Sequence, residues 1–422
     1  MKRKILPAMS LTALFILSSC GAASVSVSKI GKCDELNEDY EAFCTNRTSD
    51  EFNDSYNKFA SNVSEIANES ENNSCISPIS VYSALSMLSF STSGNTQTEI
   101  LKYLNTTEEE LKINYSKLFI SSNYYDDAID DFRETLFNSL WIQKEFEYKK
   151  ESVESVAKNA CADIFKIDFT NKYAGKYISN YVKDKTNDLI DQEINIDSST
   201  QVALVNTLYL NDPWLRFGDD ISVTNEQINF INSDNTISKD NFMIRSTSGK
   251  IYSNLDVRVM CVSTYNRYKI TFIVPNENKK ISDVFNEKNI NEAINANYFD
   301  YDQDKYIYET TTKFPKFNAE SKYDLVEALQ NKGIKDVFSS NADFSPISNT
   351  DLSCSQVIHS TKLGVDRKGI IGAAMTYVMT DGAAAPDRRT KIYEEFIVDR
   401  AFGYLVSDRY NRIIFSGIIN KI

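Results

Sequence analysis

The chain has 422 residues, of which 42% are hydrophobic, so it can bury a substantial core in one large domain or two modest ones. Its formal net charge is −13, and removal of Lys2, Arg3 and Lys4 with a leader peptide would make it −16. A surface this acidic, with no basic run, repels phosphate backbones and excludes nucleic acid as an expected partner.

The first 19 residues have the pattern of a signal peptide. "MKRK" is positively charged, and the apolar run "ILPAMSLTALFIL" is too short for a transmembrane helix. "LSSC" ends at Cys20 and resembles a bacterial lipoprotein box, in which this cysteine becomes the lipidated first residue; a plain secretory leader is the alternative. We therefore expect an exported protein, lipid-anchored at the bacterial cell surface or outer membrane, or otherwise secreted. The lipid would be its one link to a membrane.

Residues 20–48 are polar and poor in aliphatic side chains, so we expect a flexible tether between Cys20 and a folded body that begins at residue 49. Cys33 and Cys44 are close enough in sequence to form a disulfide in an oxidising compartment. The other four cysteines are single and have apolar neighbours, which is typical of small core residues: Cys75, Cys161, Cys261 and Cys354. No CxxC pair occurs, and neither a metal nor a cofactor is predicted.

The body has a helical first part and a strand-rich second part. Residues 49–67 place apolar side chains at helical spacing, and helical patterns continue to about residue 200, including "EILKYL" and "YAGKYISNYVKDKTNDLIDQ". Strand patterns follow in "QVALVNTLYL", "DVRVMCVSTY", "YKITFIVP", "EFIVD", "FGYLVSD" and "RIIFSGII". No linker or repeat separates the two parts, so the sequence predicts a single α+β domain over residues 49–422.

His359 is the one histidine of the chain and hence the candidate for a catalytic base. It alternates with Val357 and Thr361 in "LSCSQVIHSTKLGV", which predicts a strand entering a large sheet, where a lone histidine is usually a hydrogen-bonded core residue. The chain contains no G-x-S-x-G elbow, P-loop, dinucleotide fingerprint or H-E-x-x-H helix. We therefore expect that it is not an enzyme, with a hydrolase built on His359 as an alternative.

Residues 367–396, "RKGIIGAAMTYVMTDGAAAPDRRTKIYEEF", begin like a buried strand and continue into a loop. In an extended conformation, neither face of this segment carries a charge between Gly369 and Asp381. A strand that is covered on both faces has this composition, whereas an ordinary solvated loop does not.

An ordered set of motifs resembles the serpin family over residues 49–422. The motifs are "NNSCISPISVYSALSMLSFSTSGNTQTEILKYL", "TQVALVNTLYLNDPW", "KFPKFNAESKYDLVEALQNKGIKDVFSSNADFSPIS", "VIHSTKLGVDRKG" and "FIVDRAFGYLVSDRYNRIIFSGIINKI". The resemblance implies the serpin fold: one domain with a large central β-sheet, two smaller sheets, about eight or nine helices and an exposed reactive loop at about residues 367–395.

The resemblance also implies a monomeric inhibitor that acts as a suicide substrate of serine proteases. In serpins the loop is cleaved, and its N-terminal part inserts into the central sheet while the protease is still attached as an acyl-ester. The matching hinge residues are Gly369, Ile370, Gly372, Ala373, Ala374 and Thr376. Arg367 stands where the family carries an acid, and Ile370 where it carries Thr or Ser. The alternative is a non-inhibitory surface protein with a binding or structural role, whose loop is only a substrate.

Two further sites follow from the resemblance. The shutter is a polar cluster beneath the point where the sheet parts, and it would comprise Ser77, Ser80, Asn206 and His359, hydrogen-bonded to one another. The breach lies at the end of the central strand and would be marked by Trp214.

Two ways of counting along the loop predict two different positions for the scissile bond. Counting forward from the hinge places it between Ala383 and Ala384, which suits an elastase-like protease. Counting back from the closing strands favours Arg388 or Arg389, with Thr390 after the bond, for a trypsin-like protease. Cleavage after Arg389 would leave about 20 Å of slack in the inserted segment. We therefore prefer Ala383.

Overall fold

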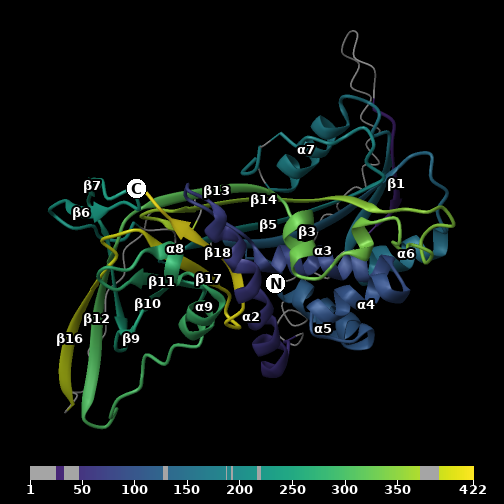
Figure 1. Ribbon diagram of the computed structural model, residues 1–422. Coiled ribbons are helices and arrows are strands. Elements are labelled where there is room, and N and C mark those ends of the chain that lie inside the picture. Colours follow the sequence, from purple (N-terminus) through teal and green to yellow (C-terminus); the bar gives the residue numbers. More distant parts are fainter. Residues whose placement is uncertain are drawn as a thin grey trace, which may run out of the picture.

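The computed structural model describes residues 25–32, 47–126, 132–186, 188–191, 193–215, 220–370 and 389–422. In these ranges an eight-stranded sheet forms the long axis of the molecule, and most helices lie on one of its faces (Figure 1). The α-helices of the described ranges are α2 (Asp50–Ser64), α3 (Pro78–Ser91), α4 (Gly94–Tyr103), α5 (Glu108–Ser121), α6 (Lys150–Asn159), α7 (Ala174–Lys185), α8 (Ile281–Val284), α9 (Glu287–Ile294) and α10 (Val326–Asn331).

The helix ends follow local capping chemistry. The Ser49 side chain accepts a hydrogen bond at the start of α2, the helix predicted to open the body. Thr107 and Glu110 form a reciprocal capping box at the start of α5. The helix predicted from residues 173–192 is shorter than its pattern: α7 ends at Lys185 with Thr186 as its C-cap, and Asp188 after it has a positive φ of 61°.

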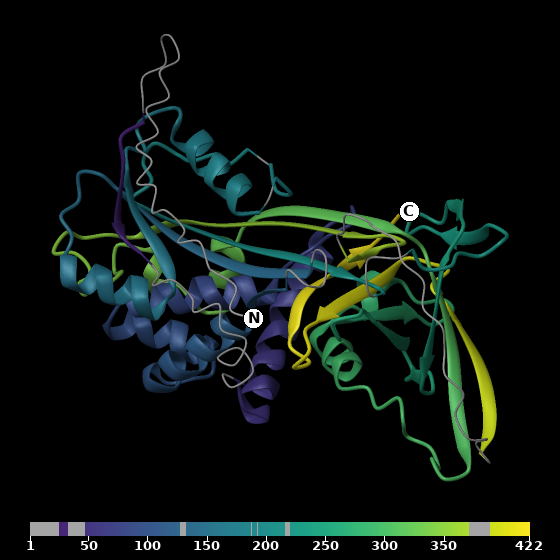
Figure 2. The same ribbon diagram turned by 180° about the vertical axis from the view of Figure 1, so that it is seen from behind.

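The large sheet has the strand order β1-β4-β3-β5-β15-β14-β13, with β2 paired to β3. α7 covers one face, where its apolar side chains pack against Trp141 and Phe165. α3, all of whose residues are buried, packs against the opposite face (Figures 1 and 2). The strands are β1 (Val27–Gly31), β2 (Asn123–Asp126), β3 (Phe132–Gln143), β4 (Ala162–Ile167), β5 (Val202–Pro213), β13 (Phe317–Asp324), β14 (Cys354–Val365) and β15 (Gly369–Ile370).

β1 differs from the prediction of a flexible tether over residues 20–48. It pairs antiparallel with β4 at the edge of the large sheet, and Lys29 forms a 2.5 Å ion pair with Asp163. The local pattern "VSVSKI" alternates β-branched and polar residues, which favours a strand even though the surrounding segment is polar. The leader, Cys20, Cys33 and Cys44 lie outside the described residues.

The two smaller sheets that were predicted are five-stranded and three-stranded. Their orders are β18-β17-β11-β10-β9 and β16-β12-β8, and a two-stranded hairpin, β6-β7, was not predicted. β12 and β16 run parallel and extend from one end of the molecule (Figure 2). The strands are β6 (Ile228–Ile231), β7 (Ile237–Asp240), β8 (Met243–Ser248), β9 (Tyr252–Ser253), β10 (Val257–Ser263), β11 (Lys269–Pro275), β12 (Tyr306–Phe314), β16 (Thr390–Ile397), β17 (Phe402–Ser407) and β18 (Ile413–Ile419).

Three of the four cysteines expected in the core are buried. They are Cys75, Cys261 and Cys354. Cys161 is only partly buried and has a positive φ of 44°, because it lies in the turn between α6 and β4. Cys161 therefore packs against the edge of the main core rather than inside it.

Candidate functional site

The large sheet is split at one end by β15. Ile370 of β15 pairs with Val365 of β14 on one side and with Asp212 of β5 on the other. Towards the opposite end β5 and β14 pair directly with each other, and this parallel pairing ends at Asn206 and His359. The two strands therefore diverge after Asn206 and His359, a point that we call the fork, and β15 occupies the wide end.

The turn that leads into β15 is anchored to the end of β5. The backbone N–H of Trp214 donates to the Lys368 carbonyl at 2.9 Å, and its indole Nε1 donates to the Asp366 carbonyl at 2.6 Å. Arg367 lies 3.4 Å from Asp220 in an ion pair. The basic residue that replaces the expected acid thus has a carboxylate partner.

Gly369 begins the hinge at a position that only glycine can occupy. A Cβ atom there would collide with the backbone of Asp212 and Pro213 in β5. The next residue, Ile370, is 0% exposed and belongs to the main core. The start of the hinge is therefore a buried strand.

Of the hydrogen bonds expected among the four predicted shutter residues, the described ranges show the one between Ser77 and His359. The backbone N–H of Ser77 donates to His359 Nε2 at 3.0 Å, and Asn206 Nδ2 donates to Asn138 Oδ1. The hydroxyls of Ser77 and Ser80 have no hydrogen-bond partner within the described ranges. Ser77 is the N-cap of α3, where backbone N–H groups lack helical acceptors, so its amide binds the imidazole. Two separate links replace the single network that we predicted.

Asn138 of β3 belongs to this cluster, and the sequence analysis missed it. It lies opposite Asn206 in the β3–β5 ladder. Its Nδ2 donates to the Tyr115 hydroxyl at 2.5 Å and to the Ala160 carbonyl at 3.0 Å. A polar residue inside the apolar stretch "LFNSLW" was the available signal, because buried amides need partners.

The geometry of His359 favours a structural role. The side chain is 2% exposed, and burial lowers the pKa of His359 to about 3, so it is a poor general base near neutrality. Its Nε2 already accepts the Ser77 N–H, and its ring stacks on Tyr323 with centroids 6.4 Å apart. Burial also raises the pKa of the Cys75 thiol to about 12, which makes it a poor nucleophile.

Only part of the predicted reactive bond region is described. Arg389 Nη1 donates to the Gln303 carbonyl at 3.3 Å, and Thr390 begins β16 opposite Tyr306. The chain is therefore part of the three-stranded sheet from Thr390 onward. The residues that lie outside the described ranges are Gly372, Ala373, Ala374, Thr376, Ala383, Ala384 and Arg388.

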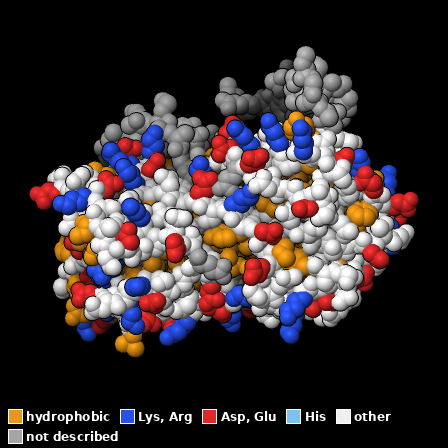
Figure 3. Space-filling view, turned by 45° about the horizontal axis from the view of Figure 1, so that its top comes forward, with side chains coloured by type: hydrophobic (Ala, Val, Ile, Leu, Met, Phe, Trp, Pro, Cys, Tyr) orange, Lys and Arg blue, Asp and Glu red, His pale blue; other side chains and the backbone are white. Residues whose placement is uncertain are grey.

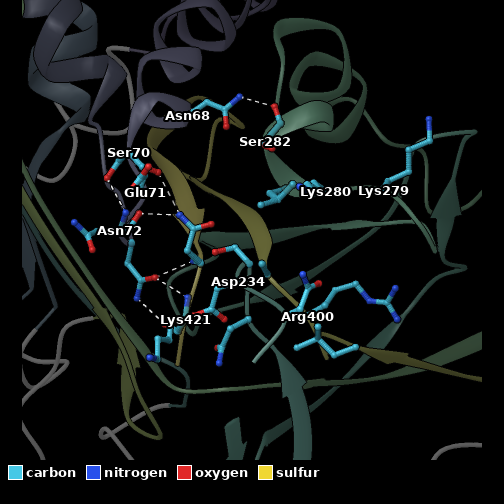
Figure 4. A pocket seen from close by; sticks show the side chains of 18 of the residues that line it. Asn68, Ser70, Glu71, Asn72, Asp234, Lys279, Lys280, Ser282, Arg400 and Lys421 are labelled. Atoms are coloured by element: carbon cyan, nitrogen blue, oxygen red, sulfur yellow. Dashed lines mark hydrogen bonds between the residues drawn. The ribbon is translucent and has the colours of Figure 1, made fainter. Parts of the chain in front are cut away.

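A polar depression of about 1320 Å³ lies between the α2–α3 connection, the β6–β7 turn and α8 (Figure 4). Its side chains mostly join these segments to one another. Asn68 donates to the Ser282 carbonyl at 2.8 Å, Asn420 holds the α2–α3 connection, and Lys279 pairs with Asp256. The depression is therefore better explained as a junction between segments than as a ligand site.

The described ranges contain neither a metal-binding cluster nor a membrane-spanning helix. No group of three or more His, Cys, Asp or Glu side chains in them could hold a metal ion. None of the helices described is both long and apolar enough to cross a membrane. On the face shown in Figure 3, acidic and basic side chains are interspersed.

Comparisons with known proteins agree with this architecture. A family profile described as Serpin (serine protease inhibitor) matches residues 54–422. Iripin-1 of Ixodes ricinus is 30% identical over 375 residues, which cover 83% of this chain and 90% of Iripin-1. The native thermophilic serpin tengpin has a TM-score of 0.73 at 24% identity, covering 93% of this chain and 97% of tengpin. The thyroxine-binding globulin complex with thyroxine has a TM-score of 0.71 at 22% identity, covering 88% and 99%.

These matches confirm the predicted α+β fold with a large central sheet and smaller sheets. They span the body from α2 to the last residue, which includes the fork and the hinge. The chain belongs to the serpin family.

Proposed function

We propose that the chain inhibits a serine protease as a suicide substrate. The protease cleaves the reactive loop, and the N-terminal part of the loop inserts between β5 and β14 before the acyl-enzyme is hydrolysed. The observation that carries this proposal is β15, which already lies between these two strands at the wide end. Insertion would extend an existing strand and, beyond the fork, separate β5 from β14.

The register of β15 supports this extension. Because Ile370 pairs antiparallel with Asp212, continuation in the same register would place Thr376 opposite Asn206 at the fork. Beyond the fork, the new strand would replace the direct pairing of β5 with β14. About a dozen ladder hydrogen bonds at about 1 kcal/mol each are comparable to the ~5–15 kcal/mol stability of a protease domain. Insertion can therefore distort an enzyme that is still attached.

We propose the bond between Ala383 and Ala384 as the scissile bond, for an elastase-like protease. Thr390 is paired in β16, so a protease that cuts after Arg389 would have to bind backbone already held in a sheet. The segment from Ile370 to Ala383 would extend about 45 Å, and cleavage after Arg389 would add about 20 Å of slack. A tighter connection transmits more force to the bound enzyme.

Incubation with elastase and with trypsin tests both proposals. We expect an SDS-resistant complex with elastase. We also expect a released C-terminal fragment whose mass shows that it starts at Ala384. Thr376→Arg would place a charge at the fork, so this variant should be cleaved without forming the complex. Thr350→Arg, in an exposed loop, is the matched control and should behave like wild type. Clean cleavage of the wild type by both enzymes, without any complex, would refute the inhibitor proposal.

A non-inhibitory binding protein is the second candidate function. The ion pair of Arg367 with Asp220 and the hydrogen bonds to Trp214 fix the turn before the hinge, which would favour a loop that stays in place. Thyroxine-binding globulin shares this fold. A thermal melt after loop cleavage distinguishes the candidates: insertion should raise the midpoint by roughly 15 °C, and a loop that is only a substrate should leave it unchanged.

We also propose that Cys20 is lipidated and anchors the protein at the bacterial cell surface. Because β1 begins at Val27, only about seven residues, or about 24 Å, would separate the lipid from the large sheet. Mass spectrometry of the mature N-terminus should find a lipidated cysteine, and Cys20→Ser should release the protein from the membrane fraction. An unmodified N-terminus at another residue would contradict this proposal.

A further inference from the structure

Two buried carboxyl groups belong to β3 and β5 near the wide end of the large sheet, where β15 separates β5 from β14. Glu134 of β3 is 1% exposed and Asp212 of β5 is 0% exposed. Asp212 is the residue that pairs with Ile370 of β15, so it adjoins the strand that would extend on insertion. Acidic side chains are rarely buried to this degree without an ion-pair partner.

The turn between β10 and β11 binds both carboxyls. Thr264 Oγ1 and Asn266 Nδ2 donate to the two oxygens of Asp212, the latter at 2.7 Å. Tyr268 donates its hydroxyl to Glu134 Oε2. The turn belongs to the five-stranded sheet, whereas the carboxyls belong to the large sheet. These hydrogen bonds therefore join the two sheets at the place where the large sheet is split.

Ionisation of these carboxyls is unfavourable in this environment. Glu134 Oε1 is buried without a hydrogen-bond partner, and neither carboxyl forms an ion pair within 4.0 Å in the part of the chain that the structure describes. Burial raises the pKa of both Glu134 and Asp212 to about 7, in spite of the hydrogen bonds and the Arg409 charge that lower it.

The surrounding charges are mostly engaged with one another. Arg412 and Asp408 form a fully buried pair, with Nε 2.7 Å from Oδ2. Asp408 raises the pKa of Glu134, while Arg409 lowers the pKa of both carboxyls. The groups that act on the carboxyls from neighbouring elements are Tyr56 of α2, Tyr268 of the β10–β11 turn, and Asp408, Arg409 and Arg412 of the β17–β18 turn.

We propose that Glu134, Asp212 and the β10–β11 turn form a pH-sensitive latch, the sheet latch, which keeps the large sheet closed while both carboxyls are protonated and loosens when they ionise. To accept a new strand, β3 and β5 must move away from β14 by about one strand spacing, ~4.8 Å. That movement breaks hydrogen bonds to a turn that stays with the other sheet, and it admits water. The latch itself does not depend on the proposed function. Its effect on the insertion of the reactive loop does.

The direction of the pH effect follows from linkage. A carboxyl whose pKa is raised in the closed state binds its proton more tightly there than in the open, hydrated state. The advantage of the closed state is therefore complete at about pH 4, and it is lost as the pH rises to about 7, by at most about tenfold per pH unit for each carboxyl. His359 contributes in the opposite direction because burial lowers its pKa, so variants must be compared with wild type at each pH.

Unfolding rates of the intact protein between pH 5 and 8.5, followed by tryptophan fluorescence, test the latch. Glu134→Gln and Asp212→Asn mimic protonated carboxyls, so the difference in unfolding rate between each variant and wild type should be smallest at pH 5 and should grow as the pH rises. At pH 7.5 and above, each should unfold at least about tenfold more slowly than wild type. The exposed residues Glu109 and Asp351 provide the matched controls Glu109→Gln and Asp351→Asn, whose rates should parallel wild type throughout.

Parallel pH curves for wild type and both latch variants would overturn the proposal. If the variants do not fold, infrared spectra of the wild type replace them: a carboxylic-acid band should persist at pH 6 and disappear with a midpoint near pH 7, and absence of that band at pH 6 would also overturn it. Neither measurement uses a protease. If the protein traps no protease, the pH dependence of its unfolding rate can still support the latch. If it traps a protease but wild type and variants have parallel pH curves, only the latch is refuted and the proposed function stands.

Discussion

The five-stranded sheet and the large sheet of this serpin differ in what they bury. Every residue of β17 and β18 is buried, and most of these residues are apolar. β5 is buried almost throughout and β14 over most of its length, yet their buried residues include polar side chains: Asn206, Thr207, Asp212, His359 and Thr361. Buried polar groups stabilise a strand only while their partners are in place. We therefore expect the five-stranded sheet to act as a fixed platform, whereas the present pairing of the large sheet depends on polar interactions that can be exchanged.

The largest expected effect comes from the platform. Phe415 of β18 is 0% exposed, and Phe415→Ala should lower the free energy of unfolding by about 3–5 kcal/mol because it leaves a cavity. Urea denaturation should give the same loss for the intact and for the elastase-cleaved protein. Leu255→Ala is the control, since Leu255 is 91% exposed and should change stability by less than about 0.5 kcal/mol. A loss confined to the intact form would contradict the idea of a fixed platform.

The next effect concerns the shutter of the large sheet. His359→Phe should lower the free energy of unfolding by about 2 kcal/mol at pH 7.5, because the buried Ser77 N–H loses its acceptor. The folded pKa of His359 is depressed, so its stabilising contribution is present above pH 6.5 and is lost as the pH falls towards 3. Urea denaturation between pH 8 and 4 should therefore show the wild type approaching the variant in acid. A constant difference would mean that His359 is hydrated in the native state.

The fold was predictable where each strand carries its own signal. The strands β10, β11, β17 and β18 are runs of β-branched and aromatic residues, and a local pattern suffices to identify them. β1 was missed because a strand of five residues lies within a polar segment and gains its stability from β4, more than 130 residues later in the chain. Asp188, which follows α7, has a positive φ, and the tendency of aspartate to adopt this conformation is too weak a sequence signal to predict a helix end.

The site was predictable only in part, for a related reason. Ser77, Asn206 and His359 were assigned through a family resemblance, which places residues but does not specify their hydrogen bonds. Asn138 and Glu134 were missed because burial of a polar side chain depends on what other strands bring next to it. Asp212 lies within the motif "TQVALVNTLYLNDPW", but the sequence alone does not show that a turn of another sheet supplies its donors.

A smaller effect is expected at the edge of the large sheet. Ile30 of β1 is half-buried against the main core, so Ile30→Ser should lower the free energy of unfolding by about 1–1.5 kcal/mol. Ser28→Ala, at an exposed position of the same strand, should have little effect. Equal denaturation midpoints for the two variants would mean that β1 does not contribute to the sheet in solution.

The smallest effect is expected at Arg367, beside the wide end of the split. Its ion pair with Asp220 is about half exposed, so a double-mutant cycle with Arg367→Ala and Asp220→Ala should give a coupling of about 0.2–1 kcal/mol. The coupling should decrease in 1 M salt, where charges are screened within about 3 Å. A salt-independent coupling of several kcal/mol would mean that this turn is as fixed as the five-stranded sheet. The wide end of the large sheet would then be as rigid as the five-stranded sheet. Cleavage of the loop alone would not be enough to extend the hinge, because this ion pair would also have to break.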